Sequence, residues 1–374
     1  MQYVTGGGLR TDYLITHTGE ARLRLPGGNA LFAAVGAAVW AEQVGLWARV
    51  GANYPQLWLD DLGRRGLGTP GLRRVSGWQD HRTFFAYTPD GRRDDTNPGA
   101  HFARIGQPLP PELRHYVHST PSQDNPDAYE PLALRPEDWP EAYAGATAVH
   151  LSPQPLSSHR FIPPALRQQG VGCITLDPGE RYMVPSLLSY LAQILPFVDA
   201  FLPSEQEIQS LFGAEVNSYW AAERLAELGA RLVVIKQGAK GVLVREENGR
   251  FTHLPPYNHP ADAPVIDVTG AGDAFCGGFL VGLAQTQEPL LAAKMGLVSA
   301  SFVIEGYGAL YALGRSQQQA LARLNTLEAG LTLMRPVAAP PPTLHPTVSP
   351  EQTLHPGAAS LVSLLDRAHF FAAG

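Results

Sequence analysis

Cysteine and charge are both scarce in this sequence of 374 residues. Its two cysteines, Cys173 and Cys276, are too few for the disulfide framework of a small secreted domain, and a reducing compartment suits them better. Only 17% of the residues are charged, and 28 basic residues against 34 acidic ones leave a net charge of −6. So mild a charge gives no general attraction to nucleic acid or to a membrane surface. The composition is otherwise that of a globular protein, 44% hydrophobic and long enough to bury a large core.

Long hydrophobic runs are missing as well. The longest candidate, residues 30–41, is too short to cross a membrane. The first residues lack the basic region and hydrophobic core of a signal peptide, and no N-x-S/T glycosylation acceptor occurs. The twelve histidines do not show the spacing of metal ligands. We therefore expect a soluble, cytoplasmic protein that binds neither nucleic acid nor membranes.

Short hydrophobic runs rich in β-branched residues alternate with segments of helical periodicity. This alternation predicts an α/β fold in which helices cover both faces of a mostly parallel sheet. The expected strands are 148–151, 173–176, 198–202 and 231–236, and the expected helices are 204–211, 218–228, 290–304 and one from Ser316 to about 327. Two further segments, 13–25 and 81–96, alternate polar and apolar residues around turns. They predict a small, separate β-sheet, suited to act as a lid.

Proline-rich stretches interrupt this pattern twice. Residues 102–140 contain many prolines and little periodicity, which is typical of an inserted loop. Prolines crowd again after residue 334, and residues 361–371 could form one last helix. We predict one domain over residues 1–330, with lid strands at about 12–25 and 81–98 and the insertion at about 102–140. A proline-rich linker and the terminal helix would follow over 331–374.

The run VIDVTGAGDAFCGGFL, residues 265–280, is the most informative part of the sequence. We expect a strand ending at Val265–Ile266, then a turn of small residues at Gly270–Gly272, then a helix from Asp273. Small residues let backbone N–H groups approach a ligand, and a helix N-terminus adds partial positive charge. Such a turn would hold a phosphoryl group during transfer, and Asp273 could accept the proton of the attacking hydroxyl.

The same run also has a purely structural interpretation. Asp273 could serve only as an acidic residue in the first turn of a helix, and the glycines only as a turn. Gly277 and Gly278, one turn further on, would let the helix pack closely on the sheet.

The order of these residues resembles the signature D-x-x-G-A-G-D-x-F of the ribokinase-like (PfkB) carbohydrate kinase family. The resemblance implies a three-layer α/β/α sandwich with a central, mostly parallel sheet and a small β lid. It implies an ATP-dependent kinase, a phosphotransferase with an alcohol acceptor, that phosphorylates a hydroxyl of a sugar-like small molecule with Mg²⁺ and, in some members, K⁺. Asp273 would be the general base, and Gly270, Ala271 and Gly272 the anion hole. Asp267 and Thr269 would lie near a monovalent cation.

The start of the chain resembles the sugar-binding end of that family. Asp12 follows a glycine-rich opening strand and would bind substrate hydroxyls, although an acid at a strand end is also common in turns. Gly27 and Gly28, followed by Asn29, look like the family's glycine pair at the sugar site. The family pattern G-G-x-x-x-N has Asn where this chain has Phe32, which fits equally well as a core residue of the helix.

Three further segments look like the nucleotide end. Pro203-Ser-Glu-Gln-Glu207 resembles P-N-x-x-E, whose Glu helps to hold Mg²⁺ through water. Ser204-x-x-Glu207 is also a capping box, which alone would explain both residues. The resemblance implies nucleotide contacts at Lys236, Gly238 and Gly241, in a K-x-G-x-x-G turn, and at Gly308. Residues 177–181, Asp-Pro-Gly-Glu-Arg, resemble D-P-N-x-R.

Three alternatives stay open at this point. A nucleoside kinase of the same fold could stack a base on Phe84, Phe85 or Tyr87 of the lid. A non-catalytic sensor could have kept the fold, since Phe32, Gly179 and Ser204 depart from the family pattern. The insertion and the tail could serve assembly, and the sequence leaves a homodimer open.

Overall fold

The computed structural model describes residues 1–88, 93–118, 123–260 and 264–333. The chain divides into a unit of residues 1–337 and a unit of residues 338–374. All described residues belong to the first unit. The expected linker and terminal helix beyond residue 333 lie outside the described residues. Among the described residues, no helix has both the length and the hydrophobicity that a membrane span requires.

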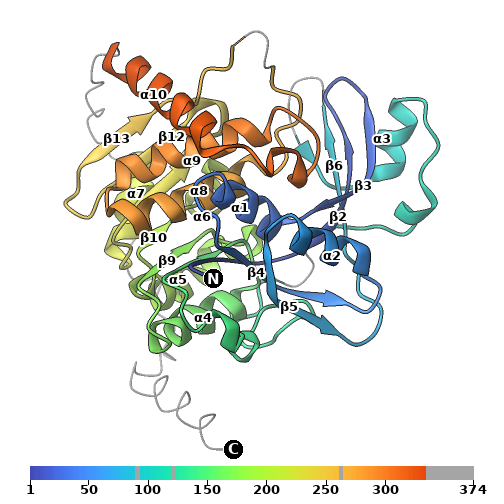
Figure 1. Ribbon diagram of the computed structural model, residues 1–374, viewed down its shortest axis with the longest axis horizontal. Helices are drawn as coiled ribbons and strands as arrows, with labels where there is room; N and C mark the ends of the chain where they lie inside the picture. Colours follow the sequence, from blue (N-terminus) through green and yellow to red (C-terminus); the bar gives the residue numbers. More distant parts are fainter. Residues whose placement is uncertain (89–92, 119–122, 261–263, 334–374) are drawn as a thin grey trace, which may run out of the picture. The chain divides into compact units, whose positions relative to one another are not determined.

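A nine-stranded sheet forms the centre of the molecule (Figure 1). Its strand order is β13-β12-β11-β10-β9-β8-β1-β4-β5, and neighbours are parallel from β11 to β5, while β12 and β13 are antiparallel. The strands are β1 Tyr3–Gly6, β4 Val44–Gly51, β5 Gly68–Val75, β8 Ala148–Leu151, β9 Cys173–Leu176, β10 Ala200–Phe201, β11 Val233–Lys236, β12 Val242–Arg245 and β13 Phe251–Leu254. The expected strands between residues 148 and 236 therefore form at their predicted places in the chain.

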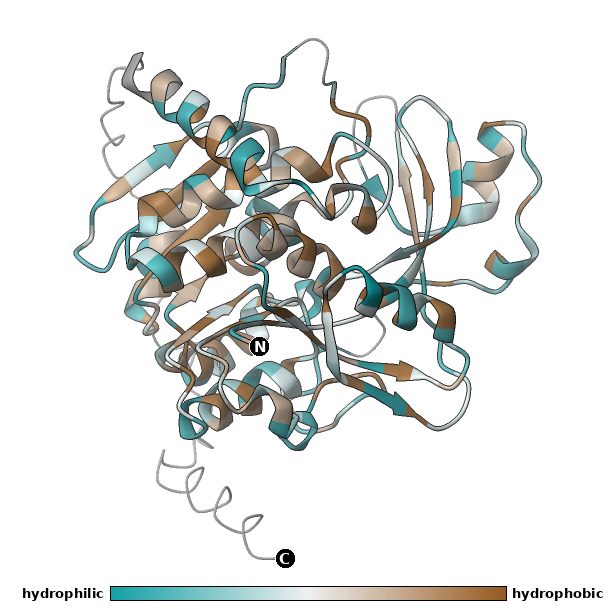
Figure 2. Cartoon of the chain, in the orientation of Figure 1, coloured by the Kyte–Doolittle hydropathy of each residue, from teal (hydrophilic) through white to brown (hydrophobic). Residues whose placement is uncertain are grey.

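Helices cover both faces of this sheet, so the predicted three-layer sandwich is confirmed. One hydrophobic core joins the sheet to α1 Asn29–Ala38, α2 Gln56–Arg64, α8 Ala271–Thr286, α9 Pro289–Val303 and α10 Gln317–Leu333. A second core on the other face joins it to α4 Leu156–Gln168, α5 Leu188–Ile194, α6 Glu205–Phe212 and α7 Ser218–Glu227. Hydrophobic residues mark α8 and α9, whereas α2 carries hydrophilic residues beside hydrophobic ones (Figure 2). Helices buried on all sides, such as α8 and α9, need hydrophobic residues all round. A helix buried on one face, such as α2, needs them on that face only.

Glycines let helices α1, α8 and α9 approach one another closely. A Cβ at Gly277 would lie 1.8 Å from the Ala33 carbonyl oxygen of α1, and one at Gly278 would lie 2.3 Å from Ser299 Oγ of α9. The expectation that these glycines pack α8 on the sheet is therefore wrong, because their partners are the two neighbouring helices.

The two alternating segments combine in one four-stranded sheet of order β3-β2-β6-β7. Its strands are β2 Arg10–Ile15, β3 Ala21–Gly27, β6 Arg82–Tyr87 and β7 Arg93–Asp94. The sheet stands beside the main sheet (Figure 1), and its outward side packs against α3 Pro98–Arg104 and residues 105–116 of the insertion. The small β-sheet expected as a lid is thus present.

Candidate functional site

A cavity of about 330 Å³ lies between the small sheet and the carboxyl ends of the main strands. Segments that follow β1, β8, β9, β10 and β11 line it together with the start of α8, which is where parallel α/β sheets usually bind ligands. Of the expected site residues, the cavity wall contains Asp12, Gly28, Asn29, Glu207, Lys236, Thr269, Gly270, Ala271, Gly272 and Asp273. The expected residues outside this wall are Gly27, Gly238, Gly241, Asp267 and Gly308.

The glycine turn leads directly into helix α8. Gly270 is the residue before the helix and has φ +75°, a left-handed conformation that glycine adopts without strain. The expected strand at Val265–Ile266 is absent; instead the Ile266 N–H donates to the Ile304 carbonyl oxygen at 2.8 Å. The helix also begins at Ala271 rather than at Asp273, so Asp273 lies within its first turn.

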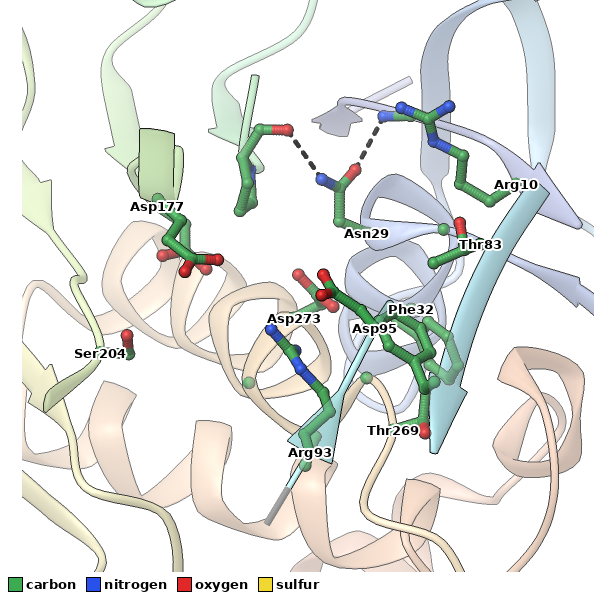
Figure 3. A pocket seen from close by; sticks show the side chains of 18 of the residues that line it. Arg10, Asn29, Phe32, Thr83, Arg93, Asp95, Asp177, Ser204, Thr269 and Asp273 are labelled. Carbon is green, nitrogen blue, oxygen red and sulfur yellow. Dashed lines mark hydrogen bonds between the residues drawn. The ribbon is translucent and has the colours of Figure 1, made fainter. Parts of the chain in front are cut away.

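Asp273 lies in the cavity wall, where both cationic and anionic side chains affect the pKa of its carboxyl. Burial raises the pKa of its carboxyl to about 6, an effect that Lys236 and Arg93 reduce and Glu207 reinforces. Figure 3 shows the Arg93 guanidinium directed toward Asp273 from the edge of the small sheet. At neutral pH the Asp273 carboxylate is therefore mostly ionised and has a basicity suited to accepting a proton.

Lys236 pairs with Asp177, which immediately follows β9. Both side chains are largely buried, and the Lys236 ammonium also lies 3.8 Å from Cys276 Sγ. Burial raises the pKa of Asp177 to about 6 even though the lysine acts against it. The sequence indicated Asp177 only through the Asp-Pro-Gly-Glu-Arg run, and the pairing with Lys236 joins the ends of β9 and β11.

Asp12 marks the opposite end of the cavity, and it belongs to lid strand β2. A Cβ at Gly27 would lie 1.7 Å from Asp12 Oδ2, so only glycine there leaves room for this carboxylate. The Gly28 N–H donates to Asp12, and Gly28 itself has φ +98°. Asp12 Oδ1 has no hydrogen-bond partner among the described residues, and burial raises the pKa of the carboxyl to about 7.

Asn29 and Phe32, both on α1, lie between the two ends of the cavity. The Asn29 side chain accepts from the Gly8 N–H and donates to the Pro153 carbonyl oxygen, at 2.7 Å each. Figure 3 shows these two bonds, by which the amide links the ends of β1 and β8. The Asn29 side chain thus stabilises the cavity wall by hydrogen bonds. The Phe32 ring packs against Gly270.

Glu207 forms the capping box of α6 and also faces the cavity. Its Oε2 accepts from the Ser204 N–H at 2.6 Å, and its own N–H donates to Ser204 Oγ at 3.2 Å. Burial and the Asp177 charge raise the pKa of Glu207 to about 7. Asp177 Oδ1 is buried without a hydrogen-bond partner among the described residues. Carboxylate oxygens suit Mg²⁺, which takes its other ligands from water and phosphate. The described residues contain no group of three His, Cys, Asp or Glu side chains placed to hold a metal alone.

Thr269 connects the glycine turn to the lid. Its hydroxyl lies 2.8 Å from Tyr87 Oη of β6, and its N–H donates to Asp267 Oδ1 at 3.0 Å. The glycines expected to contact the nucleotide lie outside the cavity wall. Gly238 and Gly241 shape the turn between β11 and β12, with φ +56° and +94°. Gly308, with φ +73°, lies near Leu25 of β3.

Sequence reasoning missed several residues of the cavity wall. β6 directs alternate residues to it, because side chains along a strand point to opposite faces every second position. The strand pattern at 82–87 could have indicated Thr83, but only the fold shows which face of the strand lines the cavity. Other missed residues lie on β2 and on or after β7 and carried no such signal; they include Arg10, Arg93 and Asp95.

Comparisons with known proteins agree with this geometry. Residues 164–313 match the model of the pfkB family carbohydrate kinases. This match covers 40% of the chain, and it supports the resemblance to that family. The resemblance stated above is therefore confirmed.

Relatives of similar sequence bear the names of kinases for different small molecules. Cytidine kinase of Thermococcus kodakarensis is 28% identical over 308 residues, which cover 82% of this chain and 98% of that protein. An uncharacterized sugar kinase of Archaeoglobus fulgidus is 35% identical over 143 residues, 38% of this chain and 54% of that protein. The class of activity is accordingly that of ATP-dependent small-molecule kinases, phosphotransferases with an alcohol acceptor.

Solved structures of PfkB-type kinases share the fold. Arabidopsis thaliana ribokinase, complexed with ribose and ATP, has a TM-score of 0.63 at 19% identity and covers 86% of this chain and 98% of its own. Burkholderia thailandensis nucleoside kinase, in complex with inosine, has a TM-score of 0.63 at 17% identity, covering 87% and 96%. The expected ribokinase-like fold is confirmed.

Proposed function

We propose that this protein transfers the γ-phosphoryl group of ATP to a hydroxyl of a sugar or sugar-like substrate bound between Asp12 and Asp273. The observation that carries the proposal is the joining of Asp273, the turn Gly270–Gly272 and Asp12 in the wall of one cavity. A base, an anion site and a hydroxyl-binding carboxylate are what this reaction requires of a protein.

In the proposed reaction Asp273 accepts the proton of the substrate hydroxyl as its oxygen attacks the γ-phosphorus. The bond between this phosphorus and the β–γ bridging oxygen breaks, and ADP leaves. N–H groups at the start of α8 would donate to the oxygens of the transferring group, where the helix N-terminus also favours negative charge. Closure of the lid would exclude water, which would otherwise hydrolyse ATP.

Mg²⁺ is the metal proposed for this site, and it would neutralise charge on the nucleotide phosphates. Glu207 would hold it through water, and Asp177, whose Oδ1 has no hydrogen-bond partner among the described residues, also lines the cavity. Lys236, Gly238, Gly241 and Gly308 remain proposed nucleotide contacts. A monovalent cation such as K⁺ is proposed near Asp267 and the Thr269 carbonyl. We also keep the proposal of a cytoplasmic location, on the grounds of the scarce cysteines.

A nucleoside is the second candidate for the phosphate acceptor. Three aromatic residues, Phe32, Phe85 and Tyr87, line the cavity, and aromatic faces can stack on a planar base. A cytidine kinase is also among the relatives that match over most of their length.

The test is ADP release by the purified protein with Mg-ATP, with and without K⁺, across sugars, polyols and nucleosides. Asp273→Asn is the matched variant, since it keeps the shape of the side chain and removes its basicity. Release that depends on one class of compound, and that the variant lacks, would support the proposal and identify the class. Compound-dependent release that Asp273→Asn retains would contradict the role of Asp273. Binding of these compounds without ADP release would favour a sensor.

A further inference from the structure

A second cavity, of about 190 Å³, adjoins the first at its Asp12 end. Gly8, Arg10, Gln123 and Gln154 line both cavities. Its outer wall is residues 130–133, part of the proline-rich insertion that the family resemblance left unexplained. The insertion thus extends the space available to a substrate beyond Asp12.

Buried and partly buried hydrogen bonds fix this part of the insertion to the rest of the protein. The Arg49 guanidinium donates to the Pro131 carbonyl oxygen at 3.1 Å. The Leu134 N–H donates to Gln154 Oε1 at 3.1 Å, and its carbonyl oxygen accepts from Ser158 Oγ at 2.7 Å. A wall fixed at three points can serve as a binding surface without a large ordering cost.

Arg10 lies at the boundary of the two cavities, and its guanidinium makes few polar interactions with the described residues. Its guanidinium makes one hydrogen bond to the residues that the structure describes, from Nη1 to the Asp80 carbonyl oxygen at 3.2 Å. Among the residues that the structure describes, no carboxylate oxygen lies within 4 Å of it. Arg82 and Arg49, in the same second cavity, each have such a partner, in Asp80 and Asp138 respectively.

The surroundings of Arg10 leave its charge incompletely balanced. Burial lowers the pKa of the guanidinium, and the charges of Asp80 and Asp12 offset this effect only in part. A cation in this state gains from a ligand that supplies hydrogen-bond acceptors. Gly8 lies beside this guanidinium: a Cβ built there would lie 3.4 Å from Arg10 Nε, at ordinary contact distance.

Two further unpartnered polar atoms lie beside Arg10. Arg10 and Asp12 are two residues apart on β2 and therefore share a face, and Thr83 is the register partner of Asp12 on β6. Asp12 Oδ1 and Thr83 Oγ1 are both buried without a hydrogen-bond partner among the described residues. Figure 3 shows Arg10, Thr83 and Asn29 at the same side of the cavity.

We propose that the second cavity is a substrate subsite in which Arg10 binds an acceptor oxygen, of a carboxylate, phosphate or ring carbonyl, on the part of the substrate remote from the phosphorylated hydroxyl. This inference rests on the proposed kinase function and narrows its substrate class. A guanidinium only donates hydrogen bonds, and a carboxylate, phosphate or carbonyl oxygen is a stronger acceptor than a hydroxyl oxygen, so a compound with hydroxyls alone should bind there more weakly. The Thr83 hydroxyl can donate to the same group, and Asp12 accepts from a hydroxyl of the substrate.

Binding without ATP tests the subsite separately from catalysis. Dissociation constants are measured by calorimetry for glucitol, gluconate, glucose 6-phosphate and cytidine, which carry hydroxyls only, a carboxylate, a phosphate and a ring carbonyl. The proteins are the wild type, Arg10→Met and Arg10→Lys, with Arg64→Met on the exposed side of α2 as the matched control. Melting temperatures confirm that each variant folds.

We expect one acceptor-bearing compound to bind the wild type most tightly, and Arg10→Met to raise its Kd at least about ten-fold. The Kd of glucitol should change less than about two-fold, Arg10→Lys should restore part of the loss, and Arg64→Met should have no effect. Leu132→Trp, which would fill the second cavity, should weaken the same compound selectively. Which compound responds shows which oxygen group the subsite takes.

Two results would overturn the subsite. One is that no acceptor-bearing compound binds more tightly than glucitol; the other is that Arg10→Met weakens all four compounds equally. A failure of the kinase function looks different: the compound binds in an Arg10-dependent way, but the wild type with Mg-ATP releases no ADP in its presence.

Discussion

The Phe32 ring occupies the space that any side chain at position 270 would need. A Cβ built on Gly270 would lie 2.1 Å from Phe32 Cδ1 and 2.2 Å from its Cγ. Phe32 belongs to α1 and Gly270 precedes α8, so this contact fixes the glycine turn against a helix that also carries Asn29 of the cavity wall. The aromatic residue found where the family pattern has Asn thus supports the proposed anion hole by packing.

Gly270→Ala should destabilise the fold and reduce turnover. The left-handed φ of +75° costs a residue with a Cβ about 1–2 kcal/mol, and the clash with Phe32 adds to this. Urea unfolding of both variants is the measurement, with Gly272→Ala as control, because a Cβ there meets only Lys236 atoms at 3.8 Å. Equal stability of Gly270→Ala and wild type would show that the turn does not hold this conformation in solution.

Asn29→Ala should loosen the junction of β1, β8 and α1. The substitution leaves the Gly8 N–H and the Pro153 carbonyl oxygen without their partner, which costs about 1–3 kcal/mol for each group left buried and unsatisfied. We expect a lower melting temperature together with weaker substrate binding, since Gly8 lies in the cavity wall. A change in substrate KM with unchanged stability would instead indicate direct contact between Asn29 and substrate.

The rate should depend on pH through Asp273. Its pKa of about 6 means that kcat/KM rises as pH increases from 5 to 7 and then levels off, because only the ionised carboxylate accepts a proton. Asp273→Asn should reduce kcat at least about 100-fold and remove this rise. A pH profile that keeps the same rise in the variant would assign it to another group.

The contribution of Asp273 to stability changes with pH in the opposite direction to its contribution to the rate. Because the folded-state pKa lies above the usual value of 3.8, the folded protein holds this proton more tightly than the unfolded chain between those values. The Asp273 contribution to stability therefore falls as pH rises from about 4 to about 6. We expect Asp273→Asn to melt at a higher temperature than wild type at pH 8, and at a similar one at pH 4. Thermal melts at both pH values test this.

Lys236→Met should reduce stability far more than Lys240→Met, although the first lysine ends β11 and the second lies in the turn that follows it. Removing Lys236 leaves the Asp177 carboxylate buried and unpaired, which costs about 3–5 kcal/mol. Lys240 is exposed and pairs with Glu205 at the surface, where loss of a pair costs about 1 kcal/mol or less. Unfolding free energies of the two variants provide the comparison.

The double variant Lys236→Met/Asp177→Asn separates stability from catalysis. It should recover part of the lost stability, because the residue at position 177 then carries no charge that needs Lys236 as its partner. It should not recover activity if Lys236 contacts the nucleotide as proposed. Recovery of both stability and activity would show that Lys236 serves only as the structural partner of Asp177.

Local sequence patterns predicted most of the architecture, because hydrophobic periodicity and helix caps act over a few residues. The capping box expected at Ser204 forms, and the helix expected from Ser316 begins with reciprocal hydrogen bonds between Ser316 and Gln319. The prediction failed at Val265–Ile266, where β-branched residues have strand propensity but the Ile266 N–H bonds to the end of α9 instead of to a strand. It failed again for the partners of Gly277 and Gly278, because composition indicates close packing without saying against what.

The sequence by itself determined the glycine turn, the acid that follows it and the fold class, since each depends on residues adjacent in the chain. Only the tertiary structure decided that Arg10, Asp12 and Thr83 lie together, that Lys236 pairs with Asp177, and that the insertion walls a second cavity. These relationships join residues from about 60 to over 100 positions apart. Their geometry comes from strand order and from the face that each strand turns to the cavity, and neither is encoded in a single local segment.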